Sequence, residues 1–265
     1  MPQESHKTFI ARALRVLKKD PHVLGVAVGG SWLTGKMDEF SDLDLVVVGK
    51  ERSYDRLMRD RLKIAGRLGK LLSGFTGEHV GEPRLIICLY DAPLLHVDLK
   101  FVTLEGFAAR IEDPEVLWER EGKLRRAILD IPPSPVHPDL QWIEDRFWVW
   151  VHYITSKIGR GELFEALDAL AFLRSRVLGP LLFEQRGLAA TGVRRLESLV
   201  PEALPEFRNT LAGHDRRSCR KALLATVTLY RKWRKALEYP GLEKRDAAEK
   251  AAVKYLAGLG GTRGR

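Results

Sequence analysis

Two short apolar runs, separated by a glycine-serine turn and an acidic pair, constrain the fold of this sequence more than any other feature. Residues 23–48 read VLGVAVGGSWLTGKMDEFSDLDLVVV. The runs 23–28 and 43–48 are rich in β-branched residues and are bounded by Gly and polar residues, which predicts two buried strands. We therefore expect a sheet whose first two strands flank the turn.

The turn after the first run can be interpreted in two ways. Gly29-Gly30-Ser31 predicts a tight turn, because Gly permits positive φ and close backbone approach. Ser31 lies where a short helix over residues 31–37 would begin, so its hydroxyl could cap that helix. The turn could equally offer its N–H groups and the Ser31 hydroxyl to a phosphate.

An acidic pair enters the second predicted strand as Asp42-Leu43-Asp44. Alternate residues of a strand share a face, so the two carboxylates point one way while Leu43 points into the core. Two carboxylates on one face repel each other unless a cation lies between them. Mg²⁺ is commonly held by carboxylate and phosphate oxygens. The residues therefore predict a phosphate-holding turn beside a divalent metal site.

This pattern resembles the nucleotidyltransferase superfamily of the DNA polymerase β type, whose signature is a Gly-Ser turn, roughly ten residues, and Asp-x-Asp. Here the signature stands as Gly30-Ser31 and Asp42-Leu43-Asp44. The resemblance implies an enzyme that transfers AMP (or another NMP) from ATP (or another NTP). Gly30 and Ser31 would hold the phosphates, and Asp42 and Asp44 would hold one or two Mg²⁺ ions.

In this superfamily a third carboxylate lies on a neighbouring strand, and Asp98 is the best match. It belongs to the run Leu95-His96-Val97-Asp98-Leu99-Lys100-Phe101, in which His96, Asp98 and Lys100 share the face turned away from the core. Asp98 would complete the metal site, act as the catalytic base, or do both. The alternative is an exposed acid paired with Lys100. His96 is more typical of a strand surface than of a ligand.

A proline-rich segment divides the chain. Residues 131–139, IPPSPVHPD, hold four prolines in nine residues, which neither a helix nor a central strand tolerates. We expect a nucleotidyltransferase domain over residues 1–130, this linker, a helical domain over 140–257 and a disordered tail over 258–265. The predicted fold class is α+β, with a mixed sheet flanked by helices and then an α-helical bundle.

Other elements follow from the hydrophobic spacing. Helices are predicted over 5–19, 53–72, 140–158, 163–183, 192–200, 202–212, 215–237 and 244–256, strands over 84–90 and 95–102, a loop over 74–82 and a short edge strand within 113–121.

A sheet domain followed by a helical bundle resembles the aminoglycoside and lincosamide adenylyltransferases, which inactivate antibiotics. Beyond residue 139 this resemblance rests on architecture and on the segment EDRFWVWVHYITSKIGRGE. The resemblance implies that Lys157 or Arg160 holds the outer phosphates, and that Glu144 or Asp145 contacts the acceptor or replaces Asp98 as the base. The alternative is that acids near a helix start and cations near its end favour the helix dipole.

Composition narrows the class of protein. The chain of 265 residues has two cysteines, too few for a disulfide framework, and Cys88 lies in an apolar run typical of the core. No apolar run reaches the roughly 20 residues that span a bilayer, and the N-terminus lacks the apolar block of a signal peptide. We therefore expect a cytoplasmic protein without a membrane partner.

The net charge of +9 leaves several functions open. It suits nucleic acid, a triphosphate substrate or solvated helix faces, and no nucleic-acid-binding module is recognisable, so nucleic acid is not the expected partner. The alternatives are a nucleotidyltransferase acting on RNA, of the tRNA type, one acting on protein, as in toxin–antitoxin pairs, or a non-catalytic nucleotide-binding protein. The acceptor would be a small hydroxyl compound, an antibiotic or a metabolite, and a homodimer is a family-level expectation.

Overall fold

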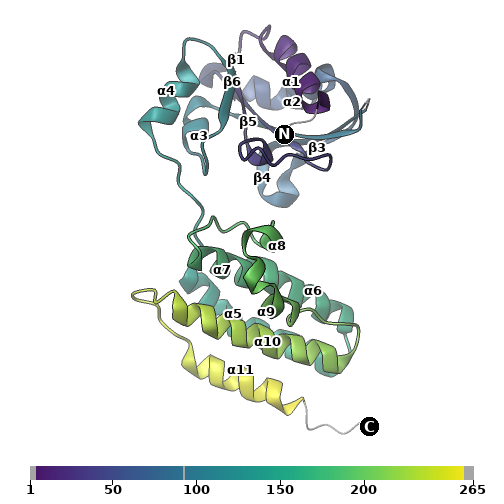
Figure 1. Cartoon of the computed structure of the whole chain (residues 1–265), viewed down its shortest axis with the longest axis vertical. Coiled ribbons are helices and arrows are strands. Elements are labelled where there is room, and N and C mark those ends of the chain that lie inside the picture. Colours follow the sequence, from purple (N-terminus) through teal and green to yellow (C-terminus); the bar gives the residue numbers. More distant parts are fainter. Residues whose placement is uncertain (1–3, 92, 260–265) are drawn as a thin grey trace. The chain divides into compact units, whose positions relative to one another are not determined.

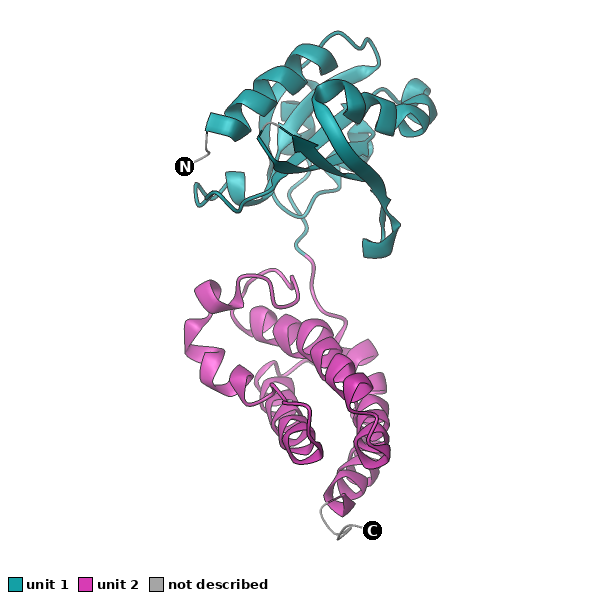
Figure 2. Ribbon diagram, turned by 90° about the vertical axis from the view of Figure 1, so that its right-hand side faces the viewer, with its two compact units in different colours: residues 1–135 teal, residues 136–265 magenta. Residues whose placement is uncertain are grey.

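A computed structural model describes residues 4–91 and 93–259 of the chain, which divides into two compact units, residues 1–135 and 136–265 (Figure 2). The border lies within the proline-rich segment. On one side of it, the Ser134 N–H donates to the Arg110 carbonyl at 2.9 Å. On the other, the Ala190 N–H donates to the Val136 carbonyl at 3.2 Å. The segment is thus bonded to both units. Most of the predicted tail, residues 260–265, lies outside the described residues.

The first unit is built on a mixed sheet that is accompanied by helices (Figure 1). Among the described residues the strand order is β3-β4-β5-β2-β1-β6. Neighbouring strands are antiparallel except β2 and β5, which run in the same direction. The strands are β1 Val23–Val28, β2 Leu43–Gly49, β3 Lys70–Gly77, β4 Glu82–Asp91, β5 Leu95–Val102 and β6 Glu115–Glu119.

Helices cover both faces of this sheet. On one face, α1 (Glu4–Leu17) and α2 (Tyr54–Leu68) pack into a core with strand residues that include Leu43 and Leu45. On the other face, α3 (Leu104–Ala108) and α4 (Lys123–Asp130) pack against residues that include Val48. Since strand side chains alternate between the two faces, even-numbered residues of β2 point toward α3 and α4.

Three parts of this unit differ from the sequence-based expectation. Residues 70–77 form an edge strand where a helix end and a loop are predicted. Their side chains show no apolar alternation, so the pattern did not predict a strand, but their backbone pairs with β4. Gly30–Trp32 is a single 3₁₀ turn (η1), not the start of a helix over residues 31–37. Helices α3 and α4 have no counterpart in the prediction.

The second unit is helical, as predicted, and its core gathers large side chains such as Phe147, Trp148, Tyr230 and Trp233. Asp139 and Asp215 cap two long helices through their carboxylates. The elements are α5 Leu140–Arg160, α6 Leu163–Leu173, a π-helical segment Arg174–Leu178, α7 Gly179–Gln185, α8 Leu196–Leu199, α9 Leu204–Arg208, α10 Arg216–Ala236 and α11 Asp246–Gly258. Together the two units confirm the predicted fold class. No helix within the described ranges has the length and apolarity needed to cross a membrane.

Candidate active site

The candidate site begins where two parallel strands place two carboxylates side by side. In the register of β2 and β5, Asp44 lies directly opposite Asp98. Neighbouring strands are about 4.8 Å apart, and register partners point to the same face of a sheet. Both residues are half-buried between fully buried neighbours, which fixes the direction of their side chains toward the α3/α4 face.

The turn after β1 contacts Asp44. The Gly29 N–H donates to the Asp44 carbonyl at 3.0 Å. Gly30 has a φ of +63°, and a Cβ on it would lie 2.0 Å from Oδ2 of Asp44. Only glycine permits both this backbone conformation and the close approach of the carboxylate. The turn and Asp44 are therefore parts of one local arrangement.

Two polar groups of the turn indicate a preference for an anion. The buried Ser31 Oγ has no hydrogen-bond partner among the described residues and does not cap a helix. Because buried polar groups normally have a hydrogen-bond partner, this hydroxyl is expected to bond a ligand or a water molecule. The Gly30 N–H donates to Oε1 of the exposed Glu112 at 3.0 Å. This carboxylate occupies a position that a phosphate oxygen could take, and sequence reasoning missed it because Glu112 lies far along the chain, just before β6.

The donor set fits Mg²⁺ as an ion shared with a substrate. Within residues 4–91 and 93–259, no group of three or more His, Cys, Asp or Glu side chains is arranged to hold a metal by itself. Mg²⁺ is usually bound by one or two carboxylates together with phosphates and water, not by an all-protein cage. Asp44 and Asp98 supply facing carboxylates, and Asp42 precedes β2 with its side chain half-buried.

The neighbours of Asp98 differ from those in the sequence-based alternative. Lys100 pairs with Glu82 at 2.8 Å. Nε2 of His96 lies 3.0 Å from Oδ1 of Asp98. His96 thus becomes a candidate for orienting Asp98, and the shared strand face of positions 96 and 98 is the sequence signal for it.

Trp32 holds the turn against the sheet. Its ring packs on the core beneath α1 and α2, and its Nε1–H donates to Oε2 of Glu115 in β6 at 2.7 Å. A pocket-lining role and a packing role are both compatible with the sequence, and these contacts support the packing role.

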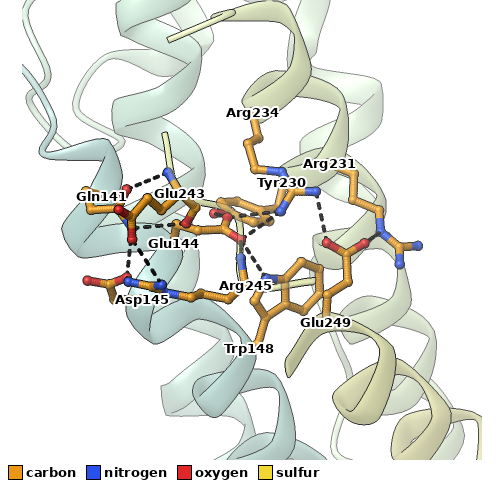
Figure 3. A network of polar contacts seen from close by, with 10 residues as sticks. All are labelled: Gln141, Glu144, Asp145, Trp148, Tyr230, Arg231, Arg234, Glu243, Arg245 and Glu249. Carbon is orange, nitrogen blue, oxygen red and sulfur yellow. Dashed lines mark hydrogen bonds and ion pairs between the residues drawn. The ribbon is translucent and has the colours of Figure 1, made fainter. Parts of the chain in front are cut away.

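Glu144 lies inside the helical unit, fully buried (Figure 3). Arg234 donates to both of its carboxylate oxygens at 2.9 and 3.0 Å, and Tyr230, Trp148 Nε1 and the Arg245 N–H also donate to it. Burial raises the pKa of Glu144, but these hydrogen bonds outweigh burial and hold its pKa below the usual value. Because its carboxylate oxygens accept all these hydrogen bonds, Glu144 stabilises the helical unit, and its contact with an acceptor stays a prediction.

Asp145, the next residue, is exposed and accepts hydrogen bonds from Gln141 and Arg245, each at 2.8 Å (Figure 3). These bonds lower its pKa. Its carboxylate is therefore negatively charged and reachable by solvent, but it already has a cationic partner.

Lys157 and Arg160 lie at the C-terminal end of α5 in the helical unit. Nζ of Lys157 contacts Glu162 at 2.6 Å and Glu165 at 3.1 Å, and these two carboxylates raise its pKa. Arg160 is 3.8 Å from Glu162. Lys157 therefore stays charged but is already neutralised by acids of its own unit, so a phosphate would compete with them.

Part of the first unit matches a known domain family. Residues 10–81 match the nucleotidyltransferase domain family, over a range that contains Gly30, Ser31, Asp42 and Asp44 but ends before Asp98. The first unit therefore carries a nucleotidyltransferase domain, and the predicted class of enzyme is confirmed. No curated protein matches the chain significantly.

Solved structures show weaker similarity. An aminoglycoside 6-adenyltransferase from Bacillus subtilis is 17% identical, with 98% of this chain and 100% of that chain covered and a TM-score of 0.44. A nucleotidyltransferase-like protein from Exiguobacterium sibiricum is 11% identical, with 96% and 89% covered and a TM-score of 0.38. Spectinomycin adenyltransferase from Enterococcus faecialis, solved with ATP and spectinomycin, is 12% identical, with 98% and 100% covered and a TM-score of 0.30.

Proposed function

We propose that this nucleotidyltransferase uses Mg²⁺ to transfer AMP from ATP to a hydroxyl group of a small molecule, such as an aminoglycoside or lincosamide antibiotic. The observation that carries the proposal is the pairing of Asp44 with Asp98 beside a turn whose Gly30 closely approaches Asp44. The domain match supports the class of reaction, and the resemblance of the sequence to antibiotic adenylyltransferases supports the class of acceptor.

Each group of the candidate site has a role in this proposal. Asp42 and Asp44 hold the metal side of the site, and Gly30 and Ser31 donate hydrogen bonds to the outer phosphates. Bound Mg²⁺ would supply charge neutralisation for the departing pyrophosphate. The acceptor oxygen forms a bond to the α-phosphorus as the bond from that phosphorus to pyrophosphate breaks.

The proton of the acceptor hydroxyl goes to Asp98 in this proposal. A catalytic base must lie within hydrogen-bond reach of the proton that it accepts, and Asp98 lies directly opposite Asp44 in the sheet. His96, 3.0 Å from Oδ1, would orient it. Glu144 is the weaker alternative because its oxygens are already occupied. The contact of Lys157 and Arg160 with phosphate stays a prediction.

The charge of the protein bears on the kind of acceptor that it would bind. An aminoglycoside is a polycation and needs acidic surroundings, whereas the net charge of +9 favours a neutral or weakly basic hydroxyl compound, such as a lincosamide or a metabolite. Antibiotic resistance, a cytoplasmic location and a homodimer are further expectations of the family resemblance.

The decisive experiment detects the product. The protein is incubated with Mg²⁺, each of the four NTPs and a panel of antibiotics, and mass spectrometry searches for an acceptor whose mass has increased by one nucleotidyl group. An adduct formed from ATP in the presence of Mg²⁺ supports the proposal. No adduct and no turnover of any NTP across the panel would remove the antibiotic class from it.

The Asp44→Asn variant tests the mechanism. We expect it to fold but to lose at least roughly a hundredfold in Mg²⁺-dependent turnover, because the metal loses a charged ligand worth several kcal/mol in the transition state. Asp38→Asn is the matched control: it removes an exposed acid of the loop between the turn and the acidic pair. Unchanged turnover in Asp44→Asn would contradict the mechanism.

A further inference from the structure

A basic pocket lies between α1 and α2, and neither the match to the domain family nor the proposed function accounts for it. It has a volume of about 640 Å³ within the first unit. Two helices and the turn after α1 contribute its cationic side chains. These are Arg12, Arg15, Lys19, Arg56 and Arg67, with Asp20 as the single acid in the lining.

The positive charge of this pocket is poorly compensated. The buried Nε of Arg12 has no hydrogen-bond partner in the described part of the chain. In that same part, the side chains of Arg15, Lys19 and Arg67 make neither a hydrogen bond nor an ion pair. Arg56 is the exception: it is 3.8 Å from Asp60 and also contacts His22. Several cations in a concave site create a strong positive potential that attracts anions.

The arrangement follows the geometry of the two helices. Arg12 and Arg15 are one turn apart on α1, and Arg56 and Arg67 are about three turns, or roughly 16 Å, apart on the same side of α2. A cation near a helix C-terminus gains a few tenths of a kcal/mol from the dipole, which would account for Arg15 or Arg67 alone. That effect does not explain why two helices direct cations into one pocket.

The pocket is distinct from the candidate active site. It lies on the face of the sheet that α1 and α2 cover, whereas Asp44 and Asp98 point toward the face of α3 and α4. Triphosphate bound by the turn at Gly30 would therefore not reach it.

We propose that this pocket binds a small phosphate-rich anion, such as a short oligophosphate or the phosphate chain of a nucleotide. Arginine presents planar donors that match phosphate oxygens, and several negative charges are needed to offset the cations that line the pocket. The lining contains no aromatic side chain on which a base could stack, which disfavours single-stranded nucleic acid as the occupant.

Calorimetric titration of the full chain with inorganic tripolyphosphate, at low ionic strength and without Mg²⁺, tests the proposal. We expect one binding site in the parent protein. The double variant Arg15→Gln/Arg67→Gln should raise Kd at least roughly tenfold, because it removes two charge-assisted contacts. The control Lys7→Gln/Arg59→Gln removes two exposed charges from the same helices, outside the pocket, and should leave Kd nearly unchanged.

Two further measurements distinguish this pocket from the candidate active site and from a nucleic-acid-binding surface. The Asp44→Asn variant should bind tripolyphosphate like the parent, since its change lies on the other face of the sheet. Loss of binding in that variant, or equal losses in the two double variants, would overturn the proposal. An RNA oligonucleotide that binds more tightly than tripolyphosphate and is weakened by the pocket variant would also overturn it, in favour of a nucleic-acid surface.

Discussion

Gly30 combines two constraints that no other residue type satisfies at its position. Its φ is +63°, and a Cβ would lie 2.0 Å from Oδ2 of Asp44. Gly35 has a similar φ of +64°, but nothing lies within 4 Å of its ideal Cβ position. Substitution of Gly35 therefore tests the effect of a positive φ alone, whereas substitution of Gly30 tests that effect together with a collision with Asp44.

We expect Gly30→Ala to abolish nucleotidyl transfer, because the added methyl group displaces the carboxylate of Asp44. Its free energy of unfolding should fall by about 2 kcal/mol or more, from backbone strain and displacement together. Gly35→Ala should lower the free energy of unfolding by only about 1 kcal/mol and leave the turnover unchanged. Urea unfolding and NTP turnover measure both effects. Equal loss of turnover in the two variants would show that the contact with Asp44 is not what matters.

The ion pairs of Glu82 should make the free energy of unfolding depend on pH. Its hydrogen bonds from Arg84, and then from Lys100, outweigh burial and lower the pKa of its carboxyl to about 2 from an ordinary value of 4.5. A carboxyl with a depressed pKa stabilises the folded state fully above its unfolded pKa, and this contribution is lost as the pH falls through the folded pKa. The loss should therefore extend from about pH 4.5 to about pH 2.

Glu82→Gln should be less stable than the parent at pH 7 by about 1 kcal/mol, a value reduced by solvent screening because all three side chains are partly exposed. The difference should shrink as the pH falls from 4.5 toward 2. Chemical unfolding across a pH series measures it. A difference that stays constant with pH would assign the effect to packing instead of charge.

At the scale of elements, Glu144 joins three parts of the helical unit. Its carboxylate on α5 bonds Tyr230 and Arg234 of α10, and the Arg245 N–H just before α11 (Figure 3). Arg234 in turn bonds Glu249 of α11 at 2.9 Å. Removing one partner from a buried pair leaves an uncompensated charge, which makes such networks sensitive to single changes.

Glu144→Gln should therefore lower the free energy of unfolding by about 3 kcal/mol. Asp145→Asn is the control on the same helix, and its exposed pair with Arg245 should contribute about 0.5 kcal/mol. Urea unfolding followed by circular dichroism compares the two. Equal, small effects would show that the buried network does not stabilise the bundle.

The helix predicted over residues 163–183 shows how packing decides where an element ends. The sequence predicts one helix that ends at residue 183, but the structure interrupts it with the π-helical segment Arg174–Leu178 and continues the helical path to Gln185. A proline has no backbone N–H to donate in the regular helical pattern. The wider π-type turn before it accommodates this missing hydrogen bond. A Cβ on Gly179 would lie 2.0 Å from the Gly192 carbonyl, so the glycine serves a close approach and not a helix end.

At the scale of the whole molecule, we propose that the two compact units are separate folding domains joined through the proline-rich segment. On the two sides of the border, Ser134 is bonded to the first unit and Val136 to the second. A protease site inserted between Pro135 and Val136 should yield two fragments that each unfold cooperatively. Calorimetry of the purified fragments measures this. A fragment that is unfolded on its own would contradict independent domains.

Sequence patterns predicted β1, β2, β5 and the long helices of the second unit, because alternation and helical spacing are local signals. They missed β3, whose exposed edge position carries no alternation, and the hydrogen bonds from the Gly30 N–H to Glu112 and from His96 to Asp98. They also offered Glu144 as a residue that contacts an acceptor. Its burial depends on partners about 90 to 100 residues away, at Arg234 and Arg245.

The sequence by itself determined the chemistry that is available: a glycine turn that tolerates positive φ, an acidic pair on one strand face, and prolines that divide the chain. These depend on local sterics and on the period of a strand, which a short stretch of residues specifies. Only the tertiary structure decided that Asp98 lies opposite Asp44. That register depends on how β5 returns to pair with β2 after α2, β3 and β4, and this return is set by the packing of distant apolar side chains on both faces of the sheet.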